Sequence, residues 1–260
     1  MNGFNVLLKK EWREYSRNYK LIWIPLVFIL FGVIEPLTNR YLPEIMEKVG
    51  NLPEGAEFPW PEFTGQDVFI SLMSQYQMIG LLIIILGFMG AISAERKNGT
   101  ASLLYVRPLS FTSYFMSKWI TINVIVLGSV WVGFGSSWYY IWALFGKVPV
   151  QDVMVFLAVY SLWIVFVTSI VLALSASFST GVTAALGIVL TIIGSVLDSV
   201  IGQFWTITPW KLPNYAALML TKGADRTDFW LTVVLTALLI GILVIAGILM
   251  SKRNASKATV

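Results

Sequence analysis

Residues 153–197 form an apolar stretch of 45 residues without a single charged side chain. As one α-helix, this stretch would be about 68 Å long, more than twice the roughly 30 Å thickness of the hydrocarbon core of a membrane. The stretch must therefore fold back on itself. Small and hydroxyl residues between Ser175 and Gly181 supply the turn, which predicts one membrane span near 153–175 and another near 182–204.

Four further apolar runs have the length of a membrane span. The composition agrees, since the chain is 57% hydrophobic and only 12% charged, whereas a soluble domain carries about a quarter charged residues. We expect an all-α integral membrane protein, a single domain over residues 1–260 with six transmembrane helices, an N-terminal interfacial amphipathic helix, and a cytoplasmic coupling helix between the second and third spans. The four additional spans are expected at 21–37, at 78–94, within 119–146 and at 229–250.

The absence of certain residue types excludes several kinds of chemistry. The chain has no cysteine and no histidine, so it lacks thiol chemistry, the commonest metal ligand and the ordinary proton shuttle at neutral pH. An enzyme embedded in the membrane is therefore the least favoured interpretation. We expect no catalytic residues, no metal site and no cofactor bound by this chain.

The first 20 residues predict a helix that lies along the membrane surface. Aromatic and aliphatic residues recur every three or four positions, opposite a cationic face, which is typical of an interfacial helix in contact with membrane lipids. A signal peptide is rejected, because the basic region is long and no small-residue cleavage site follows. The apolar face is expected to contain Phe4, Leu8, Trp12, Tyr15 and Tyr19, and the candidate site residues of this helix are Lys10, Glu11 and Trp12.

The distribution of charge predicts the orientation. Basic residues gather before the first span, between the second and third spans, and after the last one, so the positive-inside rule places both termini in the cytoplasm. The net charge of +4 is explained by these flanks, and no nucleic-acid partner is expected. An acidic loop broken by prolines is predicted outside at 38–70, and an outer loop or helix capped by Asn214 at 205–228.

The basic segment 95–118 has the features of a docking loop. Such a loop needs a short rigid helix, apolar side chains to enter a groove of a partner, and charges to fix its register. A plain loop whose positive charge sets the topology is the alternative. The segment begins with Glu95 and Arg96 at the membrane exit, breaks at Gly99 and Thr100, offers Leu103 and Leu104 as apolar knobs, ends its helix at Arg107 and Pro108, and restarts with Ser110 as the cap of the next helix.

This segment resembles the first cytoplasmic loop of the ATP-binding-cassette type-2 (ABC-2) transporter permeases, which have the type V exporter fold. The residues that carry the resemblance are Glu95, Arg96, Gly99, Thr100, Leu103, Leu104, Pro108, Tyr114 and Lys118. The resemblance implies a permease subunit that docks on separate ATPase subunits, with ATP and Mg²⁺ bound by those subunits. No P-loop motif occurs in this chain itself.

The resemblance further implies a second copy of the permease or a related one, and a place in the bacterial cytoplasmic membrane. The expected function is ATP-driven export of an amphipathic compound, a lipid, a peptide or an antibiotic. A secondary transporter is one alternative, although the spans carry almost no charge near their midpoints. A membrane sensor or scaffold that binds a soluble partner is another.

Two acidic residues and several small residues within the spans have a simpler interpretation than substrate binding. Asp198 and Glu35 are expected near the outer interface, since each lies close to the end of its span. The small residues are expected to permit close helix packing, with the lining of a cavity as the alternative. They are Gly128, Ser129, Gly133, Gly135 and Ser136 in the third span, and Gly187, Gly194 and Ser195 in the fifth.

Overall fold

The fold is known from a computed structural model, and the structure describes residues 3–49, 63–99, 110–221 and 226–257. Every regular element in these ranges is helical. Six helices, or series of helices, are long and apolar enough to cross a membrane, which confirms the predicted number of spans for the described residues.

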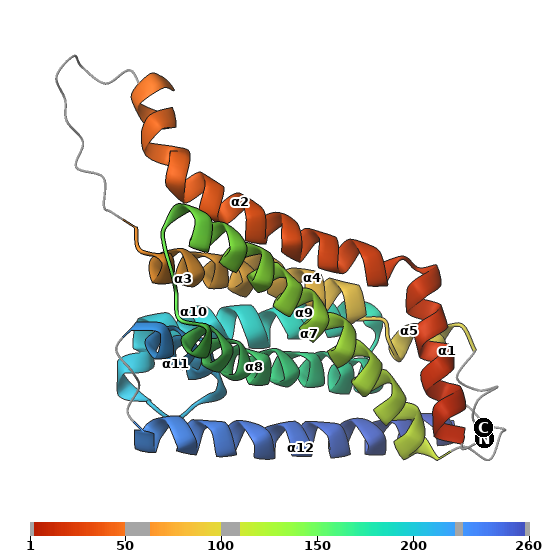
Figure 1. The fold of residues 1–260 in the computed structure, drawn as a ribbon. Helices are drawn as coiled ribbons and strands as arrows, with labels where there is room; N and C mark the ends of the chain where they lie inside the picture. Colours follow the sequence, from red (N-terminus) through yellow and green to blue (C-terminus); the bar gives the residue numbers. More distant parts are fainter. Residues whose placement is uncertain (1–2, 50–62, 100–109, 222–225, 258–260) are drawn as a thin grey trace.

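The long helices lie side by side as a bundle, and a shorter helix, α1, runs steeply across one end of it (Figure 1). The spans are α2, the series α3 to α5, α7, α8, the series α9 to α10, and α12. Their bounds, with those of the other helices, are α1 Gly3–Arg17, α2 Lys20–Val49, α3 Gly65–Gln75, α4 Leu81–Phe88, α5 Ser93–Lys97, α7 Phe111–Leu144, α8 Val150–Ser177, α9 Thr180–Ile188, α10 Gly194–Ile201, α11 Leu212–Thr221 and α12 Arg226–Lys257.

The predicted acidic loop at 38–70 is wrong at both ends. The helix α2 continues to Val49 with Pro36 and Pro43 inside it, so these prolines do not end the helix. At the other end, Thr64 and Asp67 form a reciprocal capping box that starts α3 at Gly65. Residues 50–62, the middle of the predicted loop, lie outside the described residues.

The second span is not the continuous helix expected at 78–94. A π-helical turn at Tyr76–Gly80 joins α3 to α4, and a turn at 89–92 separates α4 from α5. Ser175 of α8 fills this second break, because its hydroxyl accepts from the Ile92 and Ser93 amides at 3.0 and 3.1 Å and donates to the Met89 carbonyl at 2.9 Å. A side chain of a neighbouring helix thus satisfies backbone groups that water would otherwise have to reach.

The turn between the fourth and fifth spans is confirmed, since α8 ends at Ser177 and α9 begins at Thr180. The fifth span is interrupted by a π-helical turn at Val189–Ile193. A helix is also present within the predicted outer element, but Asn214 does not cap it. The helix α11 starts at Leu212, because a 3₁₀ turn that begins with Pro209 leads directly into it.

Glycines permit close contact between α2 and α7, as expected for Gly133. A Cβ atom built on Gly133 would lie 2.2 Å from the Tyr76 hydroxyl and 2.9 Å from the Phe28 carbonyl oxygen. That hydroxyl donates to the same carbonyl at 2.6 Å. The backbone of α7 therefore occupies space beside a hydrogen bond that ties α2 to the second span.

Replacing Gly133 with alanine is expected to destabilise the fold by about 1–3 kcal/mol, the usual cost of an overpacked core. Gly128 of the same helix has no atom within 4 Å of its Cβ position, so Gly128→Ala is the matched control. Thermal unfolding in detergent, followed by tryptophan fluorescence, measures the effect. Equal midpoints for the two variants would show that α2 and α7 do not pack this closely.

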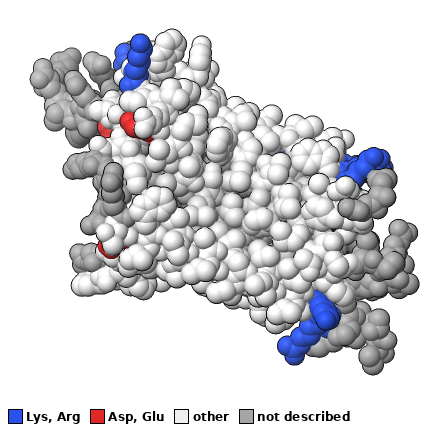
Figure 2. Space-filling model, turned by 60° about the horizontal axis from the view of Figure 1, so that its bottom comes forward, with Lys and Arg blue, Asp and Glu red and all other residues white. Residues whose placement is uncertain are grey.

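The start of α1 and the end of α12 lie at the same end of the bundle. Figure 1 shows α1 and the last turns of α12 together at this end, which we call the terminal end. The Asn254 amide of α12 donates there to the Ala176 carbonyl of α8 at 2.8 Å. The face drawn in Figure 2 carries its charged side chains toward the two ends, and the broad surface between them is uncharged. This is the surface that an apolar membrane interior requires.

Candidate functional site

The helix α1 packs on the bundle through a face that the sequence did not predict, since the predicted aromatic face concerned only contact with the lipid head groups. Its buried residues are Leu7, Glu11 and Tyr15, spaced four apart, whereas Trp12 is 47% exposed and Tyr19 is 67% exposed. The glutamate replaces an apolar residue in the buried stripe. The buried face therefore shares Tyr15 with the aromatic face, whereas Trp12 and Tyr19 remain exposed and Glu11 faces the bundle.

Glu11 meets a lysine that is also fully buried. The Lys118 ammonium of α7 lies 3.0 Å from Glu11 Oε2 and 3.0 Å from Glu95 Oε1, and the side chains of Lys118 and Glu11 have no exposed surface. The Tyr114 hydroxyl donates to the other oxygen of Glu95 at 2.5 Å. Three segments more than a dozen residues apart thus meet in one hydrogen-bonded group.

Lys10 closes this group from the solvent side. Its ammonium lies 2.9 Å from Glu11 Oε1 and 3.3 Å from Glu14 Oε2, and it also contacts Glu95. Burial disfavours the charge of Lys10, but the carboxylates of Glu11 and Glu95 outweigh it and hold the pKa of Lys10 above its ordinary value. We call Lys10, Glu11, Glu14, Glu95, Tyr114 and Lys118 the ion cluster.

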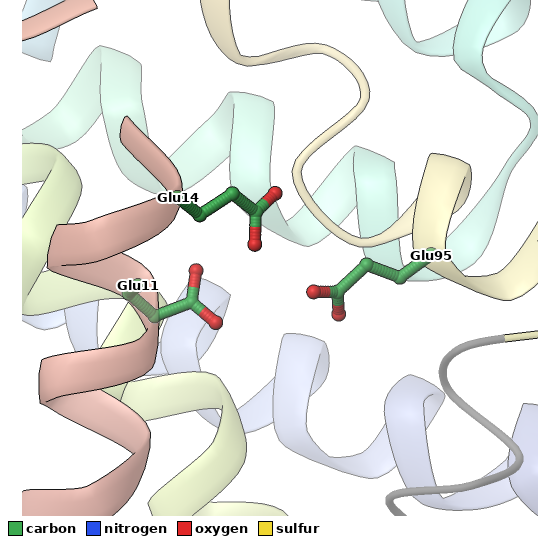
Figure 3. A group of neighbouring side chains, drawn as sticks. All are labelled: Glu11, Glu14 and Glu95. Atoms are coloured by element: carbon green, nitrogen blue, oxygen red, sulfur yellow. The ribbon is translucent and has the colours of Figure 1, made fainter. Parts of the chain in front are cut away.

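Figure 3 shows the carboxylates of Glu11 and Glu14, on α1, facing that of Glu95 on α5. One oxygen from each lies within 4.8 Å of the others, a spacing that suits a metal ion. The ammonium groups of Lys10 and Lys118 already lie against these oxygens, however. The arrangement is therefore that of an interhelical salt-bridge network, which joins α1 to the second and third spans.

Residues at both ends of the predicted docking loop belong to the ion cluster. Glu95 is on α5, the last helix before the loop, and Lys118 is in the second turn of α7, the first helix after it. Gly99 has φ +72°, a conformation that costs little only for glycine, so the break predicted there is confirmed. The predicted cap is also confirmed, because the Ser110 hydroxyl accepts from the Ser113 amide at 3.0 Å.

The middle of the docking loop, residues 100–109, lies outside the described residues. The predicted docking positions Thr100, Leu103, Leu104, Arg107 and Pro108 lie there, so their roles stay predictions.

Arg96 fastens the same region to α8. One nitrogen of its guanidinium donates to the Ala176 carbonyl at 2.6 Å, and the other donates to the Phe178 carbonyl. These carbonyls belong to the C-terminal end of α8, where a positive charge is stabilising. Arg96 is thus bound to the fourth span, α8. Its neighbour Glu95 is bound to the third span, α7.

The sequence pointed to most residues of the ion cluster without showing that they meet. Glu95, Tyr114 and Lys118 belong to the docking segment, and Lys10 and Glu11 to the interfacial helix. The prediction missed Glu14 and the contact between the two segments. One signal was present: Glu11 lies midway between Leu7 and Tyr15 at helical spacing, and a carboxylate on an apolar stripe calls for a buried cation.

The opposite end of the bundle holds a cavity of about 640 Å³ between the second span, the fifth span and α11. Its wall includes Asp198, whose carboxylate lies 3.4 Å from the Lys211 ammonium and accepts from the Trp205 indole at 3.0 Å. Asp198 lies near the end of the fifth span, as expected, but it is only 8% exposed. Its partners come from the segment after the fifth span, which folds back over the helix end.

Glu35 was also expected near the outer interface, but it lies well inside its span, because α2 continues to Val49, and it is only 9% exposed. One of its oxygens accepts from the Asn39 amide at 3.0 Å, and the other accepts from the Gln75 amide. Glu35 thus joins the middle of α2 to the last residue of α3, Gln75.

Comparison with known proteins gives two findings. Residues 5–212 match the model of a family described as ABC-2 family transporter protein. The chain is also 34% identical, over 231 residues, to the uncharacterized transmembrane protein YxlG of Bacillus subtilis (strain 168), and the match covers 88% of this chain and 89% of YxlG. The matched family region contains every residue of the ion cluster, the docking loop and five of the six spans.

Proposed function

This chain belongs to the ABC-2 family of transporter membrane proteins, and from this premise we propose that it is the permease subunit of an ATP-driven exporter served by separate ATPase subunits. One observation carries the proposal beyond the family: the ion cluster links both flanks of the docking loop to α1. A docking loop that receives force needs such a connection to the membrane helices.

The buried charges make this connection stiff. Glu11 and Lys118 have no exposed surface, so separating them would leave buried charges without partners, at a cost of several kcal/mol. A push on the loop would therefore move α1, α5 and the start of α7 together. Rigid-body displacement of packed helices is an established way to convert a local contact into a change of state.

The ATPase and its cofactors are assigned to other chains. The sequence contains no P-loop motif, so we place ATP and Mg²⁺ on the partner subunits. A second permease, identical or related, completes the proposed complex. The orientation follows from charge, because the described side chains at the terminal end are far richer in lysine and arginine than those at the opposite end, which supports cytoplasmic termini and docking loop.

We assign export of an amphipathic compound to this permease, with lipids, peptides and antibiotics as the candidate classes. The cavity at the end opposite the termini supports this class, because its wall combines apolar side chains with the Asp198–Lys211 pair and amide and hydroxyl groups. A mostly apolar pocket with a few fixed polar groups suits a ligand of mixed character.

Affinity purification from the native membrane in mild detergent tests the assignment. We expect a soluble subunit with a P-loop to co-purify in stoichiometric amount, and candidate amphipathic compounds to stimulate its ATPase activity. Repeated recovery of the permease without such a subunit, under conditions that preserve known transporter complexes, would favour a secondary transporter. Recovery of a partner that hydrolyses no ATP would favour a membrane sensor or scaffold.

A further inference from the structure

A shallow groove of about 410 Å³ lies between α2 and the second span, close to the terminal end. Its wall is apolar apart from Lys20, the first residue of α2. Trp23, Ile79 and Leu86 are 37%, 42% and 50% exposed, so the groove opens on the surface that faces the membrane. The remaining wall residues are Leu82, Ile83 and Gly87.

Lys20 is placed at the end of this groove that is nearest the membrane surface. Its ammonium donates to the Gly87 carbonyl at 2.5 Å and lies 5.3 Å from the ring centre of Tyr15 and 5.1 Å from that of Phe88. A lysine has three N–H donors. Among the described residues, no carboxylate lies within salt-bridge distance of Lys20, whereas Lys10, Lys118 and Lys211 all have one.

The aromatic faces stabilise the positive charge but do not neutralise it. The ammonium therefore retains donors and charge for an anion that approaches from the groove. The groove extends from Gly87 back to Ile79 along α4, about 12 Å at the helical rise of 1.5 Å per residue. That length accommodates much of one acyl chain and leaves the head group beside Lys20.

We infer that this groove is a binding site for one anionic phospholipid, with its phosphate on Lys20 and an acyl chain along α4. The apolar wall and its exposure toward the membrane favour a lipid over a soluble anion, since inorganic phosphate would gain nothing from Trp23 or Leu86. The bound lipid would brace the corner between α1 and α2. The groove shares no lining residue with the ion cluster or with the cavity at the opposite end, and the inference does not depend on the exporter assignment.

Native mass spectrometry of the purified full-length protein tests this inference. The probes are phosphatidylglycerol and phosphatidylcholine with identical acyl chains, supplied in equal amounts. We expect the first lipid bound to the wild type to be phosphatidylglycerol. Lys20→Gln should reduce this preference about fivefold, the factor that corresponds to roughly 1 kcal/mol per lysine at an anionic surface. Lys9→Gln is the matched control, because Lys9 is exposed on α1 and does not line the groove.

A second variant fills the groove and leaves the charge in place. Gly87 lines the groove and a Cβ atom there would meet only Ile24, at 3.9 Å, so Gly87→Leu is designed to occupy the space for the acyl chain. It should weaken the first binding event of both lipids. An absence of preference in the wild type, an equal loss in Lys9→Gln, unchanged binding in Gly87→Leu, or displacement of the lipid by millimolar inorganic phosphate would each overturn the inference.

Discussion

Replacing Lys118 with methionine is expected to lower the free energy of unfolding by about 3–5 kcal/mol, the usual cost of removing one partner of a buried ion pair. The variant keeps the length and apolar stem of the side chain but removes a charge that has no exposed surface. Glu11 loses its buried cation, and Glu95 keeps Lys10 as its one remaining cation among the described residues, together with the Tyr114 hydroxyl. The thermal unfolding midpoint in detergent and the yield of monodisperse protein measure the loss.

A second substitution separates the salt bridge from simple packing. In Glu11→Gln/Lys118→Met, the carboxylate that was left without its partner is removed as well, so the double variant should be more stable than Lys118→Met alone. Lys97→Met is the surface control, since Lys97 is exposed and takes part in none of the salt bridges found among the described residues. A double variant no better than Lys118→Met would show that Glu11 and Lys118 are not energetically coupled.

Replacing Leu103 and Leu104 together with aspartate is expected to abolish association with the ATPase subunit. If these side chains enter an apolar groove of the partner, two carboxylates would be buried there without cations. Losing an interface hot spot costs about 2 kcal/mol or more, roughly a thirtyfold loss of affinity. Co-purification of the tagged permease with its partner, quantified by mass spectrometry, measures the effect.

Two comparisons make this result specific to docking. Leu103→Met/Leu104→Met keeps two apolar side chains of similar volume and should retain the partner. Gel filtration must show that the aspartate variant remains monodisperse, because loss of the permease fold would also abolish the complex. Normal recovery of the ATPase with a folded aspartate variant would remove these leucines from the docking surface and favour a loop that only sets topology.

Most of the fold followed from the sequence because span formation is a local property. A run of about 20 apolar residues crosses the membrane as a helix regardless of its neighbours, since its backbone groups must be paired within the segment. The turn between the fourth and fifth spans, the cap at Ser110 and the break at Gly99 were predicted for the same reason. Each depends on residues only a few positions apart.

The errors have other causes. The prolines of α2 suggested a loop, but the helix continues through Pro43. The break at 89–92 was not predicted, because the group that fills it, the Ser175 hydroxyl, comes from another span. The aromatic face of α1 was predicted to meet the lipid head groups, but the burial of Leu7, Glu11 and Tyr15 against the bundle was not predicted. The break at 89–92 and the buried face of α1 both depend on contacts between distant segments, which a local pattern does not reveal.

The sequence by itself therefore determined the membrane class, the number of spans, and which residues flank the docking loop. Only the tertiary structure decided that Glu11, Glu95 and Lys118 meet in one buried network. A charge within an apolar stripe indicates that a partner is needed, but it does not identify the partner, since any lysine on another helix would satisfy it equally. The packing of α1 across the ends of the second and third spans determines that Lys118 is the partner of Glu11.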